Sequence, residues 1–258
     1  MHARPNHSRN FDMARAWDRA SAVYLARRDR SCDTVTYGAL APGEAELKLL
    51  GDLRERRVLD IGCGGGHNAV ACARAGAEVT GLDVSAAQLA HARQLAARHA
   101  VDITWLQADA AAADQPVAPG WDLILAIHSL SYVQDLAAVL AACRRLLAAD
   151  GRLVISLDHP LRDCFLDEDD GDLSAFPVRD YFDRSPVMWR FAADLPMQTA
   201  HLPISGWFQC LHEAKLVITQ MLEPPVPPDV RDDLWPLDSP LAPLRALPHT
   251  LILVAAPA

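Results

Sequence analysis

The sequence predicts an α/β fold built on a mostly parallel, seven-stranded sheet with helices on both faces. From residue 57 onward, short apolar runs alternate with helix-like segments, and two more apolar runs follow near the carboxyl terminus. Strands that alternate with helices are joined by right-handed crossovers, so the carboxyl ends of the parallel strands should meet at one edge. Ligands of such folds bind at that edge, near the point where the strand order reverses.

Each expected element has a local signal. Ser85 followed by Gln88 is a capping-box pattern, so a helix should begin there. Gly76 and Gly151 should end helices, and Pro160 should stop a strand. The expected strands are 57–61, 78–83, 102–109, 121–130, 152–160, 215–224 and 249–256. The expected helices are 66–77, 85–100, 136–151 and 204–214.

Two segments interrupt this alternation. The first is expected to form a helical lead-in, and the second mixes acids, aromatics and prolines without clean periodicity. Because the second segment follows the fifth strand, we expect it to be a lid inserted over the ligand edge. The chain then divides into a lead-in or cap (1–56), a core that carries the ligand edge (57–160), a lid insertion (161–203) and the remainder of the sheet (204–258), which includes a proline-rich connection at 224–243.

Net charge and cysteine content indicate which partners and which cellular compartment are expected. The 258 residues are 51% hydrophobic and carry a formal net charge of −9, which disfavours nucleic acid or an anionic membrane as partner. The six cysteines form no C-x-x-C pair, so we expect reduced thiols in an intracellular protein. The amino-terminal stretch has no apolar signal region, and no run approaches the ~18 apolar residues of a membrane span. We therefore expect a cytoplasmic protein.

A glycine-rich turn follows the first expected strand, with four glycines between Gly62 and Gly66. Glycine lets the backbone approach a ligand closely, and the helix that follows offers N–H donors. A dinucleotide-binding turn would need a third glycine at the position of His67, so that ligand class is disfavoured. Asp60, just before the turn, would repel a pyrophosphate and favour a cation. A ligand that carries an amino group and a sulfonium fits this turn better.

This region resembles the first half of a class I S-adenosylmethionine-dependent methyltransferase over Val58–Ser85, VLDIGCGGGHNAVACARAGAEVTGLDVS. The similarity continues through LQADA, WDLILAIHSLSYV and CRRLLAADGRLVISLDHP, so it covers about residues 35–160 well and the carboxyl-terminal strands more weakly. The resemblance implies a Rossmann-like fold, S-adenosyl-L-methionine as cofactor and S-adenosyl-L-homocysteine as product. The chain also resembles the compact enzymes that modify bacterial secondary metabolites.

The resemblance also implies a set of cofactor-binding residues. Asp83 should accept bonds from both ribose hydroxyls, Asp109 should accept from the adenine amino group, and Tyr37 should close over the methionine end. The full set expected to bind the cofactor is Tyr37, Asp60, Gly62, Cys63, Gly64, Asp83, Val84, Gln88, Asp109, Ala110, Ile127 and His128.

Methyl transfer from a sulfonium is an in-line displacement in which positioning supplies much of the rate. A base is needed only when the acceptor arrives protonated, and histidine has the pKa nearest to neutral pH. We therefore name His128, His159 and Tyr24 as catalytic candidates and His201 as a weaker one. A lone histidine is more often structural, and that alternative stays open for each.

Aromatic residues of the lead-in and the insertion are expected to line the acceptor pocket. The alternative is that they form a small core of the lid itself. These residues are Trp17, Tyr24, Phe165, Phe176, Tyr181, Phe182, Trp189 and Phe191.

No metal site is expected. The acidic run at 167–172 would need Leu166 and Pro177 as the first and last ligands of a calcium loop, and neither side chain can bind the ion. The histidines show no metal-binding spacing such as H-E-x-x-H.

The expected function is S-adenosylmethionine-dependent methyl transfer to a small molecule, with nitrogen, oxygen or carbon as the acceptor atom. An alternative is an enzyme of the same fold that keeps the cofactor and catalyses a cyclisation or rearrangement without net methyl transfer. His67 disfavours a nicotinamide oxidoreductase, and a non-catalytic binding role is the last alternative. Fold does not determine the acceptor, and the oligomeric state, monomer or homodimer, is left open.

Overall fold

A seven-stranded sheet forms the centre of the molecule, which the computed structural model describes over residues 11–26, 31–168, 171–192 and 195–258. The strand order is β3-β2-β1-β4-β5-β9-β8, and β9 alone runs antiparallel to its neighbours. The predicted mostly parallel sheet is therefore confirmed. The order reverses between β1 and β4, which is where a ligand site is expected.

The elements follow one another along the chain as predicted for the core. The sheet strands are β1 (Arg57–Ile61), β2 (Glu78–Asp83), β3 (Thr104–Gln107), β4 (Trp121–Ile127), β5 (Leu147–Asp158), β8 (Leu216–Leu222) and β9 (Thr250–Pro257). The helices are α1 (Met13–Ala26), α2 (Glu44–Leu47), α3 (His67–Arg74), α4 (Ala86–Arg98), α5 (Leu136–Leu146), α6 (Pro160–Asp163), α7 (Ile204–Glu213) and α8 (Pro228–Leu234). A separate hairpin consists of β6 (Val187–Ala192) and β7 (Leu195–Thr199).

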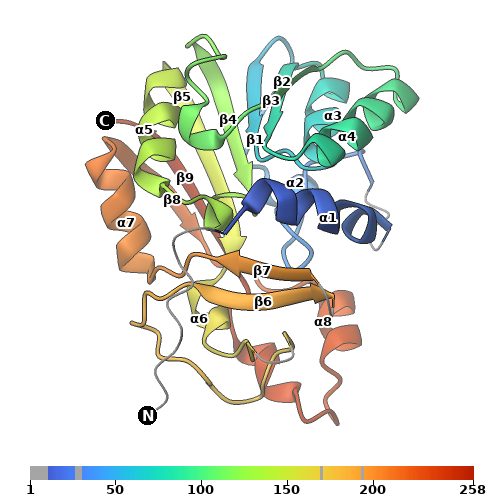
Figure 1. The fold of residues 1–258 in the computed structure, drawn as a ribbon, viewed down its shortest axis with the longest axis vertical. Helices are drawn as coiled ribbons and strands as arrows, with labels where there is room; N and C mark the ends of the chain where they lie inside the picture. Colours follow the sequence, from blue (N-terminus) through green and yellow to red (C-terminus); the bar gives the residue numbers. More distant parts are fainter. Residues whose placement is uncertain (1–10, 27–30, 169–170, 193–194) are drawn as a thin grey trace.

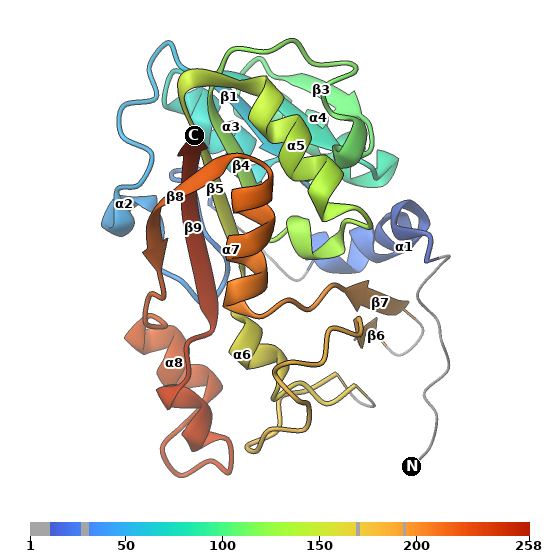
Figure 2. The same cartoon turned by 90° about the vertical axis from the view of Figure 1, so that its left-hand side faces the viewer.

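Helices cover both faces of the sheet, as predicted. The helices α5 and α7 pack on one face, and α3 and α4 pack on the other (Figure 2). Successive residues of β1 belong to the two opposite cores, Leu59 and Ile61 to the first and Val58 to the second, and all three are fully buried. A strand covered on both faces needs apolar residues at consecutive positions, which explains the continuous apolar run of β1.

The boundary between α5 and β5 differs from the prediction. The helix ends at Leu146 and the strand begins at Leu147, whereas the helix was expected to reach Gly151. Gly151 lies inside β5, where a Cβ would sit 2.5 Å from the carbonyl oxygen of Trp121 on β4. The β4–β5 register is irregular at this point. The glycine therefore allows close approach of two strands and does not end the helix.

The lead-in was predicted to be helical, whereas the insertion and the proline-rich connection contain elements that periodicity did not predict. The lead-in holds α1 and the single turn α2, while the insertion holds α6 and the β6–β7 hairpin. The connection between β8 and β9 contains α8 and a 3-10 helix, η3 (Ala242–Ala246). The elements of the insertion and of the connection are too short to show a hydrophobic period. Residues 1–10 of the predicted lead-in lie outside the described residues.

The helix α1 lies across the carboxyl edge of the sheet, between α4 and the β6–β7 hairpin (Figure 1). It therefore covers the edge at which the sequence predicts the ligand. All six cysteines are free thiols. Among the described residues, no helix combines the length and apolar character that crossing a membrane requires.

Candidate functional site

A cavity of about 320 Å³ opens at the carboxyl edge of β1, β2 and β4, beneath α1. Its volume lies in the range of small-molecule sites in proteins. The sheet side is formed by the glycine turn and the loops after β2, β3 and β4, and the opposite side by α1. The cavity thus lies at the reversal point of the strand order.

The glycine turn bends sharply between β1 and α3. Gly62 has φ +68° and Gly64 has φ +54°, in the left-handed region that glycine adopts without strain. A Cβ on Gly62 would lie 2.3 Å from the Cβ of Ser129, in the loop after β4. Two loops from neighbouring strands therefore meet at Gly62 with no room for a side chain.

Asp83 ends β2 in the wall of the cavity and is held by backbone donors. Its Oδ2 accepts a bond of 2.8 Å from the N–H of Gly64, and its Oδ1 accepts one of 2.8 Å from the N–H of Ser85. Burial raises the pKa of this carboxyl above its usual value, although the backbone bonds act in the opposite direction. The carboxylate is oriented by the chain and keeps further lone pairs for a ligand.

Asp60 lies at the end of β1 and is 2% exposed. Its Oδ2 has no hydrogen-bond partner among the described residues. Burial and, secondly, the negative charge of Asp83 raise the pKa of Asp60 to about 7. A buried acceptor without a donor is costly, so its presence in a cavity wall indicates a position for a donor from a ligand.

Gln88 has a second unpaired oxygen in the same cavity. Its Oε1 is buried and has no hydrogen-bond partner among the described residues. The predicted capping box is only half formed, because Ser85 Oγ accepts from the N–H of Gln88 at 3.2 Å while the N–H of Ser85 bonds to Asp83. The Gln88 side chain is thereby left in the cavity wall and does not return to the cap.

The remaining predicted cofactor residues of the core also line the cavity, namely Cys63, Val84, Asp109, Ala110, Ile127 and His128. Asp109 begins the 3-10 helix η1 (Ala110–Ala112), and its Oδ1 accepts from the N–H of Ala111 at 2.9 Å. That these residues bind a cofactor remains a prediction. Within the described part of the chain, no lysine or arginine lines the cavity, whereas four aspartates do, at positions 12, 60, 83 and 109.

His128 follows β4 with φ +50°, a conformation that is strained for a residue with a Cβ. Its backbone N–H donates to the carbonyl oxygen of Ser156 at 2.6 Å, and its Nε2 lies 3.0 Å from the carbonyl oxygen of Tyr37. A carbonyl can only accept, so Nε2 carries the hydrogen and Nδ1 of the neutral ring keeps a lone pair. Nδ1 lies 3.9 Å from Oδ1 of Asp158.

Aromatic rings from α1 and the loop after β4 form the other wall. Trp17 packs edge-to-face against Tyr24 at 5.4 Å and against Tyr132 at 5.1 Å, measured between ring centroids. All three line the cavity. Phe191 of the hairpin packs against Tyr24 at 5.8 Å and so extends this wall toward the insertion.

Tyr37 does not lie where the resemblance implied. Its ring is fully buried outside the cavity, and its hydroxyl donates to Oε2 of Glu44 at 2.6 Å. Burial and this bond raise the pKa of the phenol. The carboxylate of Glu44 also caps the backbone at Leu49 and Leu50, so the ring anchors the lead-in. Only the carbonyl of Tyr37 reaches the site, through His128.

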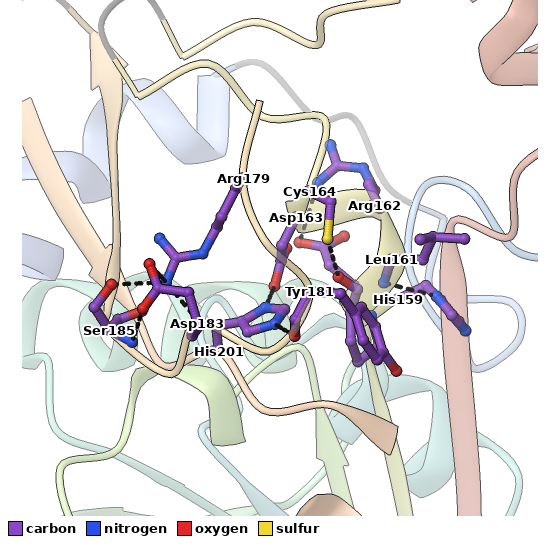
Figure 3. Close-up of polar contacts among 12 residues, drawn as sticks. His159, Leu161, Arg162, Asp163, Cys164, Arg179, Tyr181, Asp183, Ser185 and His201 are labelled. Carbon is purple, nitrogen blue, oxygen red and sulfur yellow. Dashed lines mark hydrogen bonds and ion pairs between the residues drawn. The ribbon is translucent and has the colours of Figure 1, made fainter. Parts of the chain in front are cut away.

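His159 and His201 make structural contacts (Figure 3), and neither residue lines the cavity. His159 caps α6, its Nδ1 accepting from the N–H of Leu161 at 3.0 Å, and its Nε2 therefore donates to Glu223 at 2.7 Å. His201 bridges Asp163 and the carbonyl oxygen of Tyr181, each at 2.9 Å. Of the three predicted catalytic candidates, His128 and Tyr24 lie at the cavity and His159 does not.

Of the eight aromatic residues predicted to line the acceptor pocket, only some lie at the cavity. Trp17 and Tyr24 line the cavity, whereas Phe191 packs against Tyr24 and Trp189 packs against Phe191, both outside the cavity lining. The other four do not line it: Phe165 packs on a third, smaller core, Tyr181 beside His201, and Phe176 and Phe182 are exposed.

Three comparisons with known proteins bear on this site. The model of the methyltransferase domain family matches residues 59–153, which include the glycine turn, Asp83 and Asp109. A ubiquinone biosynthesis O-methyltransferase of Alkalilimnicola ehrlichii is 39% identical over 109 residues, covering 42% of this chain and 44% of that protein. A methyltransferase structure from Mesorhizobium loti has 26% identity and a TM-score of 0.65, covering 81% of this chain and 94% of that one.

Residues 59–153 are thus similar to the methyltransferase domain of class I S-adenosylmethionine-dependent enzymes. The predicted family is confirmed, and the observed strand order is typical of it. The family uses S-adenosylmethionine as methyl donor. The chain spans less than half the length of the curated relatives it matches.

A third relative shows the fold over almost the whole chain. The 1,6-didemethyltoxoflavin-N1-methyltransferase of Burkholderia thailandensis, solved with its acceptor and S-adenosylhomocysteine, has 17% identity and a TM-score of 0.58. It covers 99% of this chain and 92% of that one. The methyltransferase fold thus extends through the insertion, at an identity that leaves the acceptor undetermined.

Proposed function

We propose that this methyltransferase transfers a methyl group from S-adenosylmethionine to a flat small molecule held between α1 and the loop after β4. The observation that carries the proposal is the pair of unpaired buried oxygens, Asp60 Oδ2 and Gln88 Oε1, in the cavity that Asp83 also lines. An acidic cavity suits a cofactor with a net positive charge. The donor set is therefore compatible with S-adenosylmethionine.

Each cofactor residue has a distinct proposed task. Asp60 accepts from the ammonium of the methionine part, Asp83 from the ribose hydroxyls and Asp109 from the adenine amino group. The turn at Gly62 and Gly64 allows the backbone to approach the methionine part. When bound, S-adenosylmethionine supplies an electrophilic methyl group and leaves as S-adenosylhomocysteine.

The acceptor is proposed to be an aromatic molecule without an anionic group. Trp17, Tyr24 and Tyr132 offer ring edges and faces to a flat ligand. Because no lysine or arginine among the described residues lines the cavity, a carboxylate or phosphate on the acceptor would lack a protein counter-charge. The family model ends at residue 153, so it does not cover the insertion that completes this wall.

A hydroxyl acceptor would lose one proton during methylation. His128 supports this role, because its Nε2–H is committed to the Tyr37 carbonyl and its Nδ1 keeps a lone pair. Asp158 would stabilise the imidazolium that forms. The named ubiquinone relatives are O-methyltransferases, and we extend oxygen methylation to this chain as part of the proposal.

Calorimetric titration with S-adenosylhomocysteine tests the cofactor site. Wild type should bind, and Asp83→Asn and Asp109→Ala should each weaken binding about 10-fold or more, because each removes charge-assisted hydrogen bonds. The matched control is Asp102→Ala, an exposed acid just before β3 and at the opposite end of that strand from Asp109. Absence of binding by wild type would refute the proposal.

Turnover with a panel of uncharged phenols, followed by the release of S-adenosylhomocysteine, tests the acceptor. His128→Gln should lower kcat about 100-fold or more near neutral pH when the cofactor is saturating. The deficit should shrink as pH rises toward ~10, where a phenol loses its proton unaided. Conversion of a substrate without release of S-adenosylhomocysteine would instead support the cyclisation alternative.

A further inference from the structure

The inward face of α1 forms the upper wall of the cavity. Trp17 and Tyr24 lie seven residues apart on this face and line the cavity, and Ser21 between them is buried. At its carboxyl-terminal end Leu25 contacts the glycine turn, since a Cβ on Gly65 would lie 2.6 Å from Leu25 Cδ2. The placement of α1 therefore decides the shape of both the cofactor and the acceptor parts of the cavity.

One acidic side chain of α1 reaches the first turn of α4. Asp18 Oδ1 accepts a bond of 2.6 Å from Ser85 Oγ and one of 3.1 Å from the N–H of Ala87. The N–H groups of a first helical turn have no partner within the helix, so a carboxylate stabilises them. Asp18 thus joins α1 to α4, which are distant in sequence. It directly follows Trp17, whose indole ring lines the cavity.

This bond continues a chain of hydrogen bonds into the cofactor site. The N–H of Gly64 donates to Asp83, the N–H of Ser85 donates to the same carboxylate, and the hydroxyl of Ser85 donates to Asp18. Every link from the glycine turn to α1 is direct and no longer than 2.8 Å. The carboxylate proposed to hold the ribose and the helix above the cavity are therefore fixed by one shared residue, Ser85.

We infer that Asp18 is a positioning residue, which holds α1 and its Trp17 over the bound cofactor by fastening the helix to the start of α4. The inference rests on the proposed function, since it assigns the cavity beneath α1 to S-adenosylmethionine. Without Asp18, the hydroxyl of Ser85 and the N–H of Ala87 lose their acceptor, and the wall above the cofactor is less tightly held.

The test compares Asp18→Ala with Asp18→Asn, which keeps an oxygen that accepts both bonds. Stopped-flow measurement of S-adenosylhomocysteine dissociation should give a rate about fivefold or more above wild type for Asp18→Ala, as expected for two lost hydrogen bonds. Asp18→Asn should stay within about twofold of wild type. Arg15→Ala, an exposed change on the same helix, is the matched control.

A steady-state measurement should agree with the dissociation rates. The KM for S-adenosylmethionine should rise in Asp18→Ala more than kcat falls, and Asp18→Asn should restore both. Wild-type dissociation from a folded Asp18→Ala protein would overturn the inference, and so would equal losses in the alanine and asparagine variants. Failure of the wild-type protein itself to bind S-adenosylhomocysteine would instead refute the proposed function on which the inference rests.

Discussion

Two aspartates at the ends of neighbouring strands are kept in an unfavourable environment by the fold. Asp60 is almost completely buried, and one of its oxygens lacks a donor among the described residues. This burial and, secondly, the like charge of Asp83 raise the pKa of Asp60 to about 7. Buried carboxyl groups with a shifted pKa are concentrated at functional sites, where a ligand can supply the missing hydrogen-bond donor.

This pKa predicts how stability depends on pH. The unfolded carboxyl titrates near 3.8, while the folded one keeps its proton up to about 7. The unfolded state therefore binds fewer protons between these values, and the contribution of Asp60 to stability falls as pH rises through this window. Urea unfolding at pH 5 and pH 8 should show a smaller loss in Asp60→Asn than in wild type.

Added S-adenosylhomocysteine provides the control for that measurement. Its ammonium should favour the charged carboxylate and so reduce the wild-type loss at pH 8. An identical pH response in wild type and Asp60→Asn would show that Asp60 ionises normally in the fold.

At the scale of elements, the turn between β1 and α3 is determined by one close contact. Gly62 meets the loop after β4 through Ser129, whose Oγ also donates to the carbonyl oxygen of Ile61 at 2.8 Å. Neighbouring strands of the sheet are thereby tied together at their carboxyl ends. A side chain at position 62 would separate the two loops that form the floor of the cavity.

Two alanine substitutions isolate that contact. Gly62 and Gly51 have φ of +68° and +69°, but a Cβ on Gly51 would meet no atom within 4 Å. Gly51→Ala should cost only the backbone strain of about 1–2 kcal/mol, whereas Gly62→Ala should cost a further ~1–3 kcal/mol from overpacking. Urea unfolding measures the free energy of unfolding of both variants. An equal decrease in the two variants would mean that the loops move apart to accommodate the new side chain at position 62.

At the scale of the whole molecule, the insertion is held together by a buried polar network of its own residues (Figure 3). Arg179 donates to Glu168 at 2.8 Å and to backbone carbonyls of Asp183 and Ser185. His201 joins Asp163, where the insertion leaves the core, to the carbonyl of Tyr181 in the middle of the insertion. Both partners of His201 are acceptors, so the ring is satisfied only when it carries two protons.

The contacts that hold the insertion together should therefore weaken at high pH. Burial lowers the pKa of His201, but Asp163 and the Tyr181 carbonyl raise it by more, so the folded value lies above the ordinary 6.5. Stability from this ring is complete at low pH and is lost as pH rises through the folded pKa. Trypsin should cleave the insertion faster at pH 8.5 than at pH 6, after correction with a peptide substrate.

An Asp163→Asn variant tests the cause of this pH dependence. It should be cleaved faster than wild type at pH 6 and show a smaller change with pH, because its His201 lacks the carboxylate that favours the charged ring. A pH dependence equal to that of wild type would assign the effect to other groups.

The sequence by itself determined the elements whose signals are contiguous. The strands β1 and β2 have the predicted bounds, Ser85 caps α4, and the glycine turn lies at the carboxyl edge beside Asp60 and Asp83. These features depend on local backbone preference and on apolar runs that must be buried. They also carry the family signature, which lies within residues 59–153.

Only the tertiary structure decided which side chains reach the cavity. The ring of His159 bonds to Glu223, which is 64 residues away in the sequence. The carbonyl oxygen of Tyr37 orients the ring of His128, which is 91 residues away. Asp18 was not singled out by any motif, and its partner Ser85 lies 67 residues further along the chain. Such pairings depend on how distant segments pack, because a hydrogen bond needs two groups within about 3 Å and no local pattern records the second group.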